Sequence, residues 1–328
     1  MSPSPSQSLA TLRPDLAGAF MEFDLEMDRK GFIGLHLFPV IEVGLQADNP
    51  GRVPLEELLQ VEPTLRASGS TYKRGSFTFT KWQYATEENA REEPLDQRDV
   101  KRYRHLIDAE TVAAQRALDK VLRGQEKRIA DALTDVSANG WTTGNAALQT
   151  VAATVWSNPA ADIIGDVEAA VRQVFNQTGI WPDTLAINKF AFRDMRNNDG
   201  ILDRIASSGA GSSIKAANVT TAQIAEVLDL PKILVAGSAT NTAAQGQPRA
   251  VAPLWANDFA MVCKTSDSND HREPCLGRTF HWGEDGSSIG GTIEQYWEEQ
   301  SRSDIYRVRH DTDEVIMYRE LGHRIVIG

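Results

Sequence analysis

Residues 156–205 have the sequence WSNPAADIIGDVEAAVRQVFNQTGIWPDTLAINKFAFRDMRNNDGILDRI, along which helix and strand signals alternate. The Asn158-Pro159 pair predicts a helix start, apolar residues three or four positions apart predict the helix itself, and Gly179 predicts its end. Residues 184–188, TLAIN, predict a strand, and residues 190–195 predict a short second helix. This alternation is typical of an α/β domain.

The same pattern continues to about residue 285. Thr220 and Gln223 predict a capping box for a helix over residues 224–228. Three further strands are predicted, at residues 232–237, 254–264 and 277–282. Two loops are predicted, at residues 207–218 and 238–247. Residues 156–285 are therefore predicted to form one α/β unit.

The chain before this unit has a different character. Residues 1 to about 20 are rich in Ser and Pro and predict an extended arm, and residues 35–43 predict a short strand with Pro39 at an edge or a bend. Residues 50–95 predict a long β-hairpin because they are rich in aromatic and β-branched residues. Phe77 and Phe79 alternate on one face of it, while Trp82 and Tyr84 fall on the other. Such a hairpin has too few apolar residues to be stable alone, so we expect it to lie on another surface.

The remaining segments predict two more helices and a closing hairpin. Apolar residues in steps of three and four predict one long helix from Asp99 to about Val136. Residues 293–301 predict a short helix. Residues 304–310 and 314–320 predict a hairpin around a tight turn at residues 311–313, and the last five residues predict a strand.

Composition excludes several classes of protein. The 328 residues carry a formal charge of −11, which argues against a nucleic-acid binder that relies on a general basic field. No apolar run approaches the roughly 20 residues of a membrane helix, and the N-terminus does not resemble a secretory signal. Two cysteines cannot form a disulfide framework, so we expect a soluble protein of a reducing compartment.

No motif for catalysis or cofactor binding is present in the sequence. It contains no phosphate-binding Gly-rich loop, no nucleophile elbow and no His-Glu-x-x-His pair. Cys263, His271, Cys275 and His281 are spaced too unevenly for a zinc site, so no metal is expected. The acidic pairs near residue 90 are more typical of a solvated or pairing surface than of catalytic carboxylates. We therefore predict no catalytic residue and no cofactor.

The order of elements carries a family resemblance: arm, projecting hairpin, long helix, α/β unit, then a short helix and a terminal hairpin. Together with residues 38–43 (FPVIEV), 156–205, 220–244 and 254–263 (LWANDFAMVC), it resembles the major capsid proteins of tailed bacteriophages, which have the Hong-Kong-97-type fold. The resemblance implies an α+β fold in four parts. These are an N-terminal arm (1–35), an extended loop (50–95), a peripheral domain with a long spine helix (36–49, 96–155 and 286–328) and an α/β axial domain (156–285).

The resemblance also implies a function. The chain would be a structural protein of the virion that self-assembles through pentamers and hexamers into an icosahedral shell around double-stranded DNA. It would bind that DNA without sequence specificity, associate with no membrane, and assemble in the cytoplasm of the host bacterium. Its partners would include a portal, possible decoration proteins and a separate scaffolding protein. A separate scaffolding protein is expected because no long helical segment precedes the loop to serve as a fused scaffold. The alternative is that this chain is a processed mature form, but the Met1 start favours the separate scaffold.

The candidate contacts between subunits lie in the predicted hairpin. They are Arg66, Lys73, Arg74, Phe77, Phe79, Lys81, Trp82, Glu87, Glu88, Glu92 and Glu93. The four basic residues either serve solubility or contact acids on a neighbouring chain. Some members of the family join a loop Lys to an Asn of an adjacent peripheral domain. Residues 286–328 contain no Asn, so we predict no such covalent bond.

Two other functions remain open at this point. An encapsulin-like shell that holds a cargo enzyme resembles the same fold, although the Ser/Pro-rich N-terminus differs from the helix with which such shells begin. An α/β enzyme with its site in residues 156–285 is the alternative from another class. It would need a pocket with convergent polar groups.

Overall fold

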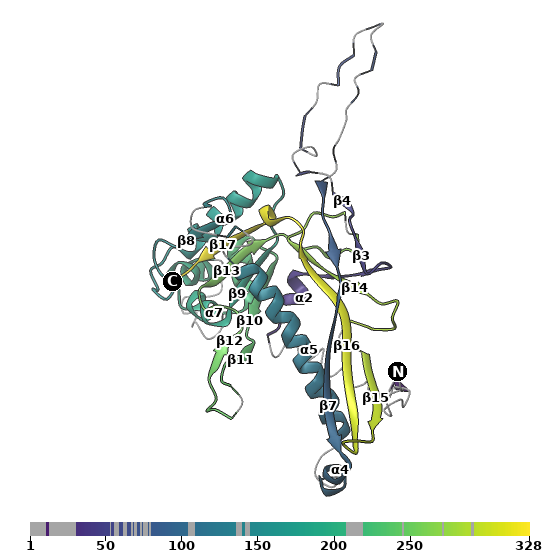
Figure 1. The fold of residues 1–328 in the computed structure, drawn as a ribbon. Helices are drawn as coiled ribbons and strands as arrows, with labels where there is room; N and C mark the ends of the chain where they lie inside the picture. The colour runs from purple at the N-terminus through teal and green to yellow at the C-terminus, as the bar shows by residue number, and fades with distance from the viewer. Residues whose placement is uncertain are drawn as a thin grey trace.

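A computed structural model defines the fold. It describes residues 11–12, 31–52, 54–55, 59–61, 64–66, 68, 71–72, 74, 78, 80–103, 109–135, 140–141, 145–207, 219–244, 246–270, 272–289 and 292–328. Most of the predicted arm and residues 208–218 of one predicted loop lie outside these residues. The described part consists of two main sheets with helices packed on them (Figure 1). None of its helices is both long and apolar enough to span a bilayer.

The first main sheet has five strands in the order β10-β9-β13-β17-β8. The strands are β8 (Gln149–Val151), β9 (Thr184–Asn188), β10 (Lys232–Ala236), β13 (Phe259–Cys263) and β17 (Gly322–Val326). β9 pairs in parallel with β10, and β17 pairs in parallel with β8, while β13 is antiparallel to both of its neighbours. Every residue of β9 and β13 is buried, which is why both segments are nearly continuous apolar runs.

Four helices pack around this sheet. They are α6 (Ile163–Thr178), α7 (Lys189–Arg196), α8 (Asp199–Ile205) and α9 (Thr221–Leu228). The predicted capping box is present, because the Thr220 side chain accepts from the Gln223 N–H and the Gln223 side chain accepts in return. Gly179 ends α6 with φ of 66°, also as predicted. The predicted start of α6 is wrong: Asp162 caps it by accepting a hydrogen bond from the Gly165 N–H at 3.0 Å.

The second main sheet has six strands around one very long strand, β16 (Ser303–Ile316). Its other strands are β1 (Thr11–Leu12), β2 (Val40–Val43), β7 (Glu87–Asp96), β14 (Gly277–Trp282) and β15 (Thr292–Glu298). β16 pairs with β15, β14 and β7, all antiparallel, and β2 extends the sheet in parallel beside β14. Figure 1 shows α5 (Ala109–Thr134) lying along β7 and β16.

Two sequence predictions for the last part of the chain are wrong. Residues 293–301 are mostly strand β15 rather than a helix, because they pair with β16 along their length. Residues 311–313 form no turn but lie inside β16, where Asp311 pairs with Glu88 of β7 and Thr312 pairs with His281 of β14. Pairing on both sides of the strand therefore overrides the turn propensity of this acidic segment.

The predicted long helix corresponds to two helices, α4 (Gln97–Tyr103) and α5, and residues 104–108 are not described. The predicted apolar stripe of α5 is buried, including Ala117, Leu118, Ile129 and Leu133. The predicted strand at residues 35–43 begins instead as the short helix α2 (Gly34–Leu37) and then becomes β2 at the edge of its sheet.

Several small elements complete the fold. They are β3 (Ala47–Asp48), β4 (Gly51–Arg52), β5 (Thr80–Lys81), β6 (Tyr84–Ala85), β11 (Ala239–Asn241), β12 (Val251–Pro253) and the 3-10 helix η4 (Arg319–Leu321). β11 and β12 form a hairpin where the sequence predicted a loop. β3 pairs with β6 and β4 pairs with β5, so the two ends of the predicted hairpin lie side by side. Residues 87–95 are not part of this excursion, because they form most of β7.

The predicted domain boundaries do not coincide with the two sheets. β14 was predicted in the α/β axial unit, but it belongs to the six-stranded sheet. β8 and β17 were predicted in the peripheral domain, but they complete the five-stranded sheet. The reason is that β17 supplies the hydrogen-bond partners that β13 and β8 need, whatever their distance along the chain.

Candidate subunit-contact surface

Residues 50–85 meet the body of the protein at an aromatic cluster. Trp82 packs on Phe280 with ring centroids 5.1 Å apart, and Tyr84 stacks on the same ring at 4.8 Å. Tyr84 is buried, and its hydroxyl donates to the Leu45 carbonyl at 3.1 Å. On the adjacent strand β4, the Arg52 guanidinium lies 4.6 Å from the centre of the Tyr318 ring. Trp82 therefore anchors the segment to its own chain, although the sequence made it a candidate contact.

Beyond this cluster, three of the described apolar side chains of the segment have almost no cover. Val61 is 98% exposed, Leu65 is 88% exposed and Tyr72 is 76% exposed. The Arg66 guanidinium lies over the Tyr72 ring at 4.4 Å. Three exposed apolar side chains on one projecting segment are characteristic of a surface that another molecule covers.

The predicted basic and aromatic contacts are only partly described. Arg74 and Lys81 are exposed, in keeping with a contact role, and Lys81 pairs with Gly51 at the foot of the segment. Lys73, Phe77 and Phe79 lie outside the described residues.

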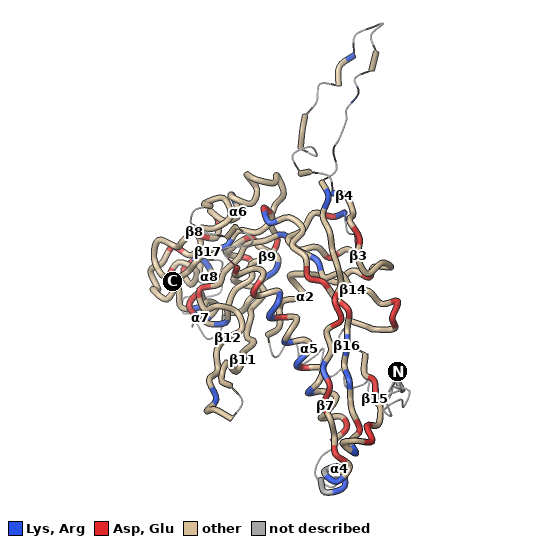
Figure 2. Tube along the Cα trace, viewed as in Figure 1, with Lys and Arg blue, Asp and Glu red and all other residues tan. Residues whose placement is uncertain are grey.

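The predicted acidic contacts lie on β7, where two of them are engaged within the chain. Glu92 accepts from Arg307 at 2.7 Å and from the Tyr296 hydroxyl at 2.9 Å. Glu93 pairs with Lys120 of α5. In Figure 2, acidic residues of β7 lie beside basic residues of α5 and β16, in keeping with these pairs. Glu87 and Glu88 are exposed.

A further ion pair of this sheet was not predicted from the sequence. Arg128 of α5 binds both carboxylate oxygens of Glu314, at 2.7 and 2.9 Å, and the Asn89 side chain at 3.0 Å. This two-pronged geometry ties α5 to β16 and β7 more firmly than a simple surface pair would. The sequence shows charged residues at helical spacing along α5, but it gives no sign that Arg128 pairs with Glu314, which lies 186 positions later.

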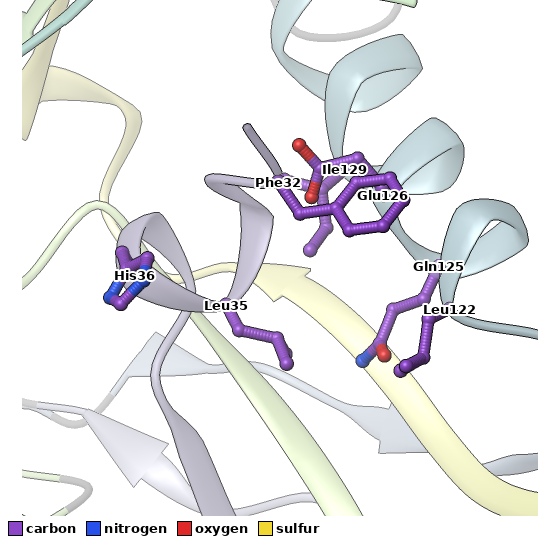
Figure 3. A pocket seen from close by; sticks show the side chains of 7 residues that line it. All are labelled: Phe32, Leu35, His36, Leu122, Gln125, Glu126 and Ile129. Carbon is purple, nitrogen blue, oxygen red and sulfur yellow. The ribbon is translucent and has the colours of Figure 1, made fainter. Parts of the chain in front are cut away.

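A buried carboxylate joins the start of the described chain to the long helix. Glu126 of α5 accepts from the N–H groups of Ile33 and Gly34 at 2.9 and 2.7 Å, and from the Trp255 indole N–H at 2.7 Å. Figure 3 shows Phe32 and Ile129 beside this carboxylate, with His36 farther away on α2. Burial raises the pKa of Glu126, although the three donors and nearby His36 oppose that shift. The joint holds α2, α5 and the segment before β13 together.

The described residues contain no cluster of side chains suited to hold a metal ion. No three His, Cys, Asp or Glu side chains of the described chain gather where they would hold a metal ion. Cys263 and Cys275 are buried free thiols whose pKa values are raised chiefly by burial, which makes them poor nucleophiles. His271 of the candidate zinc set lies outside the described residues.

One cavity in the five-stranded sheet region remains as a place for a ligand. It has a volume of about 350 Å³ and lies where β9 and β10 end, between α7 and the β11–β12 hairpin. We call it the α7 cavity. Its lining contains Lys189, Arg193 and Ser238 but no carboxylate, His or Cys.

Comparisons with known proteins identify the fold. No model of a protein family matches the chain, and no curated protein matches it either. A phage-related protein from Bordetella bronchiseptica RB50 has a similar structure over 98% of both chains, with a TM-score of 0.68 and 19% identity. The capsid structure of cyanophage P-SCSP1u matches 88% of this chain and 86% of its own, with a TM-score of 0.53 and 10% identity.

An encapsulin complex from Synechococcus elongatus PCC 7942 is also similar. It matches 91% of this chain and 89% of its own, with a TM-score of 0.52 and 8% identity. These matches extend over nearly the whole of each chain, so they concern the complete architecture. The chain has the Hong-Kong-97-type α+β fold that its sequence predicted.

Proposed function

We propose that this chain is a major capsid protein, which assembles with copies of itself into a closed icosahedral shell around double-stranded phage DNA. The observation that carries the proposal is the end-to-end likeness of the fold to a phage-related protein and to a cyanophage capsid. Many copies of one moderate contact are enough to make a stable particle. Head-to-tail contacts close into rings of five and six and so limit growth.

The parts of the fold receive corresponding roles. The five-stranded sheet and helices α6–α9 form the axial domain at the centre of a ring, which corrects the sequence-based bounds of 156–285. The six-stranded sheet and α5 form the peripheral domain. Residues 50–85 form the extended loop, and residues 1–35 form the N-terminal arm. The β11–β12 hairpin extends from the axial domain and is a candidate contact near the ring axis (Figure 1).

The extended loop supplies the main contact with a neighbouring subunit. Val61, Leu65 and Tyr72 are more than three-quarters exposed, and covering them against a neighbour removes apolar surface from water. Arg74 and Lys81 are exposed beside them and complement a chain whose overall charge is −11. Glu92 and Glu93 serve mainly to hold β7 in its own subunit, so among the acids Glu87 and Glu88 are the better contact candidates.

The role is structural rather than enzymatic, and the chain works as part of a virion shell assembled in the cytoplasm of a host bacterium. Its further partners are a separate scaffolding protein, a portal and possible decoration proteins, and it encloses DNA without reading its sequence. The acidic balance suits this last role, because a shell that attracts DNA weakly leaves the packaged DNA free to move.

A second candidate function is a nanocompartment shell around an enzyme, which the structural likeness to an encapsulin supports. The two functions share the fold and differ in what the particle contains. Nuclease-resistant DNA inside purified particles supports the capsid, whereas a co-purifying enzyme and no DNA support the nanocompartment.

The test is negative-stain electron microscopy after size-exclusion chromatography, with and without the neighbouring genes expressed. Closed shells, rings or sheets are expected. A monomer under every condition would overturn the proposal. The charge-reversed K73E/R74E variant should assemble less well than wild type, and the defect should be larger at low salt than at high salt. The matched reversal K127E/R172E, on exposed helical cations, should assemble normally.

A further inference from the structure

One end of the six-stranded sheet is divided into a basic half and an acidic half. Three strand ends are level there, because Ser303 at the start of β16 pairs with Asp96 at the end of β7 and with Glu298 at the end of β15. On one side of β16 the chain continues from β7 into α4, and on the other side residues 299–302 connect β15 to β16. We call α4 together with residues 298–304 the distal tip.

The basic half of the distal tip is α4. Its charged residues are three cations and one acid: Arg98, Lys101, Arg102 and Asp99. Arg98 and Lys101 stand three positions apart, so they share a face of the helix, and both are exposed. The Arg98 N–H donates to the Asp96 carboxylate at 2.7 Å, which fixes α4 at the end of β7. Neither of these cations has an ion pair with a described residue, whereas Lys120 of the neighbouring α5 pairs with Glu93.

The acidic half of the distal tip is formed by residues 298–304. Its charged residues are three acids and one cation: Glu298, Glu299, Asp304 and Arg302. Glu299 is exposed and Glu298 is half-buried. Within the described part of the chain their hydrogen-bond partners are neutral: Glu299 accepts from the Trp297 indole N–H at 2.7 Å, and Glu298 accepts from the Ser301 hydroxyl at 2.5 Å. These bonds orient the carboxylates without neutralising their charge.

The distal tip lies far from the axial domain. Figure 1 shows α4 and the connection between β15 and β16 at one extremity of the six-stranded sheet, well away from α6 and α7. Figure 2 shows basic residues on α4 and acidic residues near the end of β15. In the proposed ring the axial domain surrounds the axis, so the distal tip lies at the outer margin of the ring. The copies that it can meet there belong to another ring.

We propose that the distal tip binds the distal tip of a second copy of this chain, with the basic half of each against the acidic half of the other. The inference rests on the proposed shell function and names a surface through which adjoining rings meet. Three cations against one acid give α4 a net charge of +2, and three acids against one cation give residues 298–304 a net charge of −2. The tip is therefore complementary to itself, as a symmetric contact between identical chains requires. Duplex DNA fits less well, because its phosphates would also meet the acidic half.

The tip contact is weak in a single pair of chains and becomes effective by repetition. An exposed ion pair contributes at most about 1 kcal/mol. A closed particle repeats the contact in every subunit, so a small change at one tip is multiplied over the shell. Reversing the charge of one half replaces attraction by repulsion at every repeat. Shell formation should therefore respond steeply to the charge of the distal tip, while the contacts within a ring stay intact.

The experiment compares charge-reversed full-length chains over a series of protein concentrations, by size-exclusion chromatography and negative-stain electron microscopy. R98E/K101E makes the whole tip acidic, and E298K/E299K makes it basic. Each should raise the protein concentration needed for closed shells by at least about tenfold, with rings still formed. The quadruple variant R98E/K101E/E298K/E299K is again complementary to itself and should assemble within about twofold of wild type. K127E/R172E is the matched control on exposed cations elsewhere and should behave as wild type. Equal thermal unfolding midpoints confirm that the variants fold.

The outcomes separate this inference from the proposed shell function. Shells formed equally well by wild type, R98E/K101E and E298K/E299K would overturn the tip contact and leave the shell proposal standing. A wild type that forms neither rings nor shells would overturn both. Normal assembly of E298K/E299K, with defects in R98E/K101E and in the quadruple variant, would show that α4 contacts something other than a second tip, such as DNA, and would also overturn the inference.

Discussion

Replacement of Glu126 tests the buried joint between α2, α5 and Trp255. Glu126→Ala removes the acceptor of three hydrogen bonds of 2.7 to 2.9 Å, all in buried surroundings. Each orphaned donor costs about 1–3 kcal/mol, and loss of a buried charged partner typically costs about 3–5 kcal/mol in total. We therefore expect a loss of about 3–5 kcal/mol in the free energy of unfolding. Glu126→Gln keeps one acceptor oxygen, so its loss should be about 1–3 kcal/mol.

The assay is equilibrium unfolding in guanidinium chloride, followed by the fluorescence of the buried tryptophans. Glu168→Ala is the matched control, because Glu168 is an exposed acid of α6 whose pair with Arg172 contributes at most about 1 kcal/mol. If Glu126→Ala and Glu168→Ala lose the same free energy, the joint does not stabilise the fold as argued.

Wild type and Glu126→Gln also provide a test of pH dependence. Burial raises the pKa of Glu126 above 4.5, so the folded state keeps a proton that the unfolded chain has already released. Wild-type stability should therefore fall relative to Glu126→Gln as the pH rises from about 4.5 toward the raised pKa. If the difference in unfolding free energy between wild type and Glu126→Gln stays constant with pH, or changes in the opposite direction, the raised pKa of Glu126 is contradicted.

Three further predictions concern other parts of the molecule. Burial lowers the pKa of His310 to about 4, so as the pH falls the unfolded chain takes up a proton before the folded protein does. The free energy of unfolding of wild type should therefore decrease by up to about 1.4 kcal/mol per pH unit as the pH is lowered from about 6.5 to 4. His310→Gln should flatten that slope, and equal slopes in the two proteins would refute the prediction. Gly277→Ala would place a Cβ 2.5 Å from the buried Phe38 ring and should lower the free energy of unfolding in denaturant by about 1–3 kcal/mol. Gly44→Ala, whose Cβ would meet nothing within 4 Å, should lower it by under about 0.5 kcal/mol. Similar losses in the two variants would contradict the close packing of Gly277 on Phe38. Particles boiled in detergent should run as monomers on a gel, and ladders of covalent multimers would show the cross-link that we predict to be absent.

Local signals predicted the five-stranded region well. Gly179, the Thr220–Gln223 capping box and the TLAIN strand each depend on a few neighbouring residues, and the structure shows all three. Their physics is local, because a cap or a left-handed C-cap is satisfied within one turn of the chain. The alternation of such signals was enough to predict an α/β unit, whereas the class of the whole fold followed from the family resemblance.

Long-range pairing explains the errors. Glu294, Gln295 and Glu298 have high helix propensity, yet they lie in β15 because β16 pairs with the whole segment. Asp311 and Thr312 have turn propensity, yet they are buried in β16 between two partner strands. Neither partner is recognisable from the segment itself, so propensity alone gives the wrong element.

The candidate contact site was predictable only in outline. The sequence showed that residues 50–95 could not bury their aromatic residues alone, and the exposed Leu65 and Tyr72 agree with that argument. It did not show that Trp82 packs on Phe280, nearly 200 residues later, or that Glu92 pairs with Arg307. The α7 cavity was not predicted at all, because its two walls come from separate elements.

The order of strands in the five-stranded sheet has a consequence for synthesis. β8 pairs only with β17 among the described strands, and β13 needs β17 on its second edge, yet the ribosome makes β17 long after β8 and β13. The sheet cannot close until β17 has been made, so folding waits for distant segments to meet and is expected to be slow. Until then the exposed edges favour wrong associations. In the proposed shell, a subunit would present its finished surfaces only after β17 has paired in one sheet and β16 in the other, so assembly would follow the completion of both sheets.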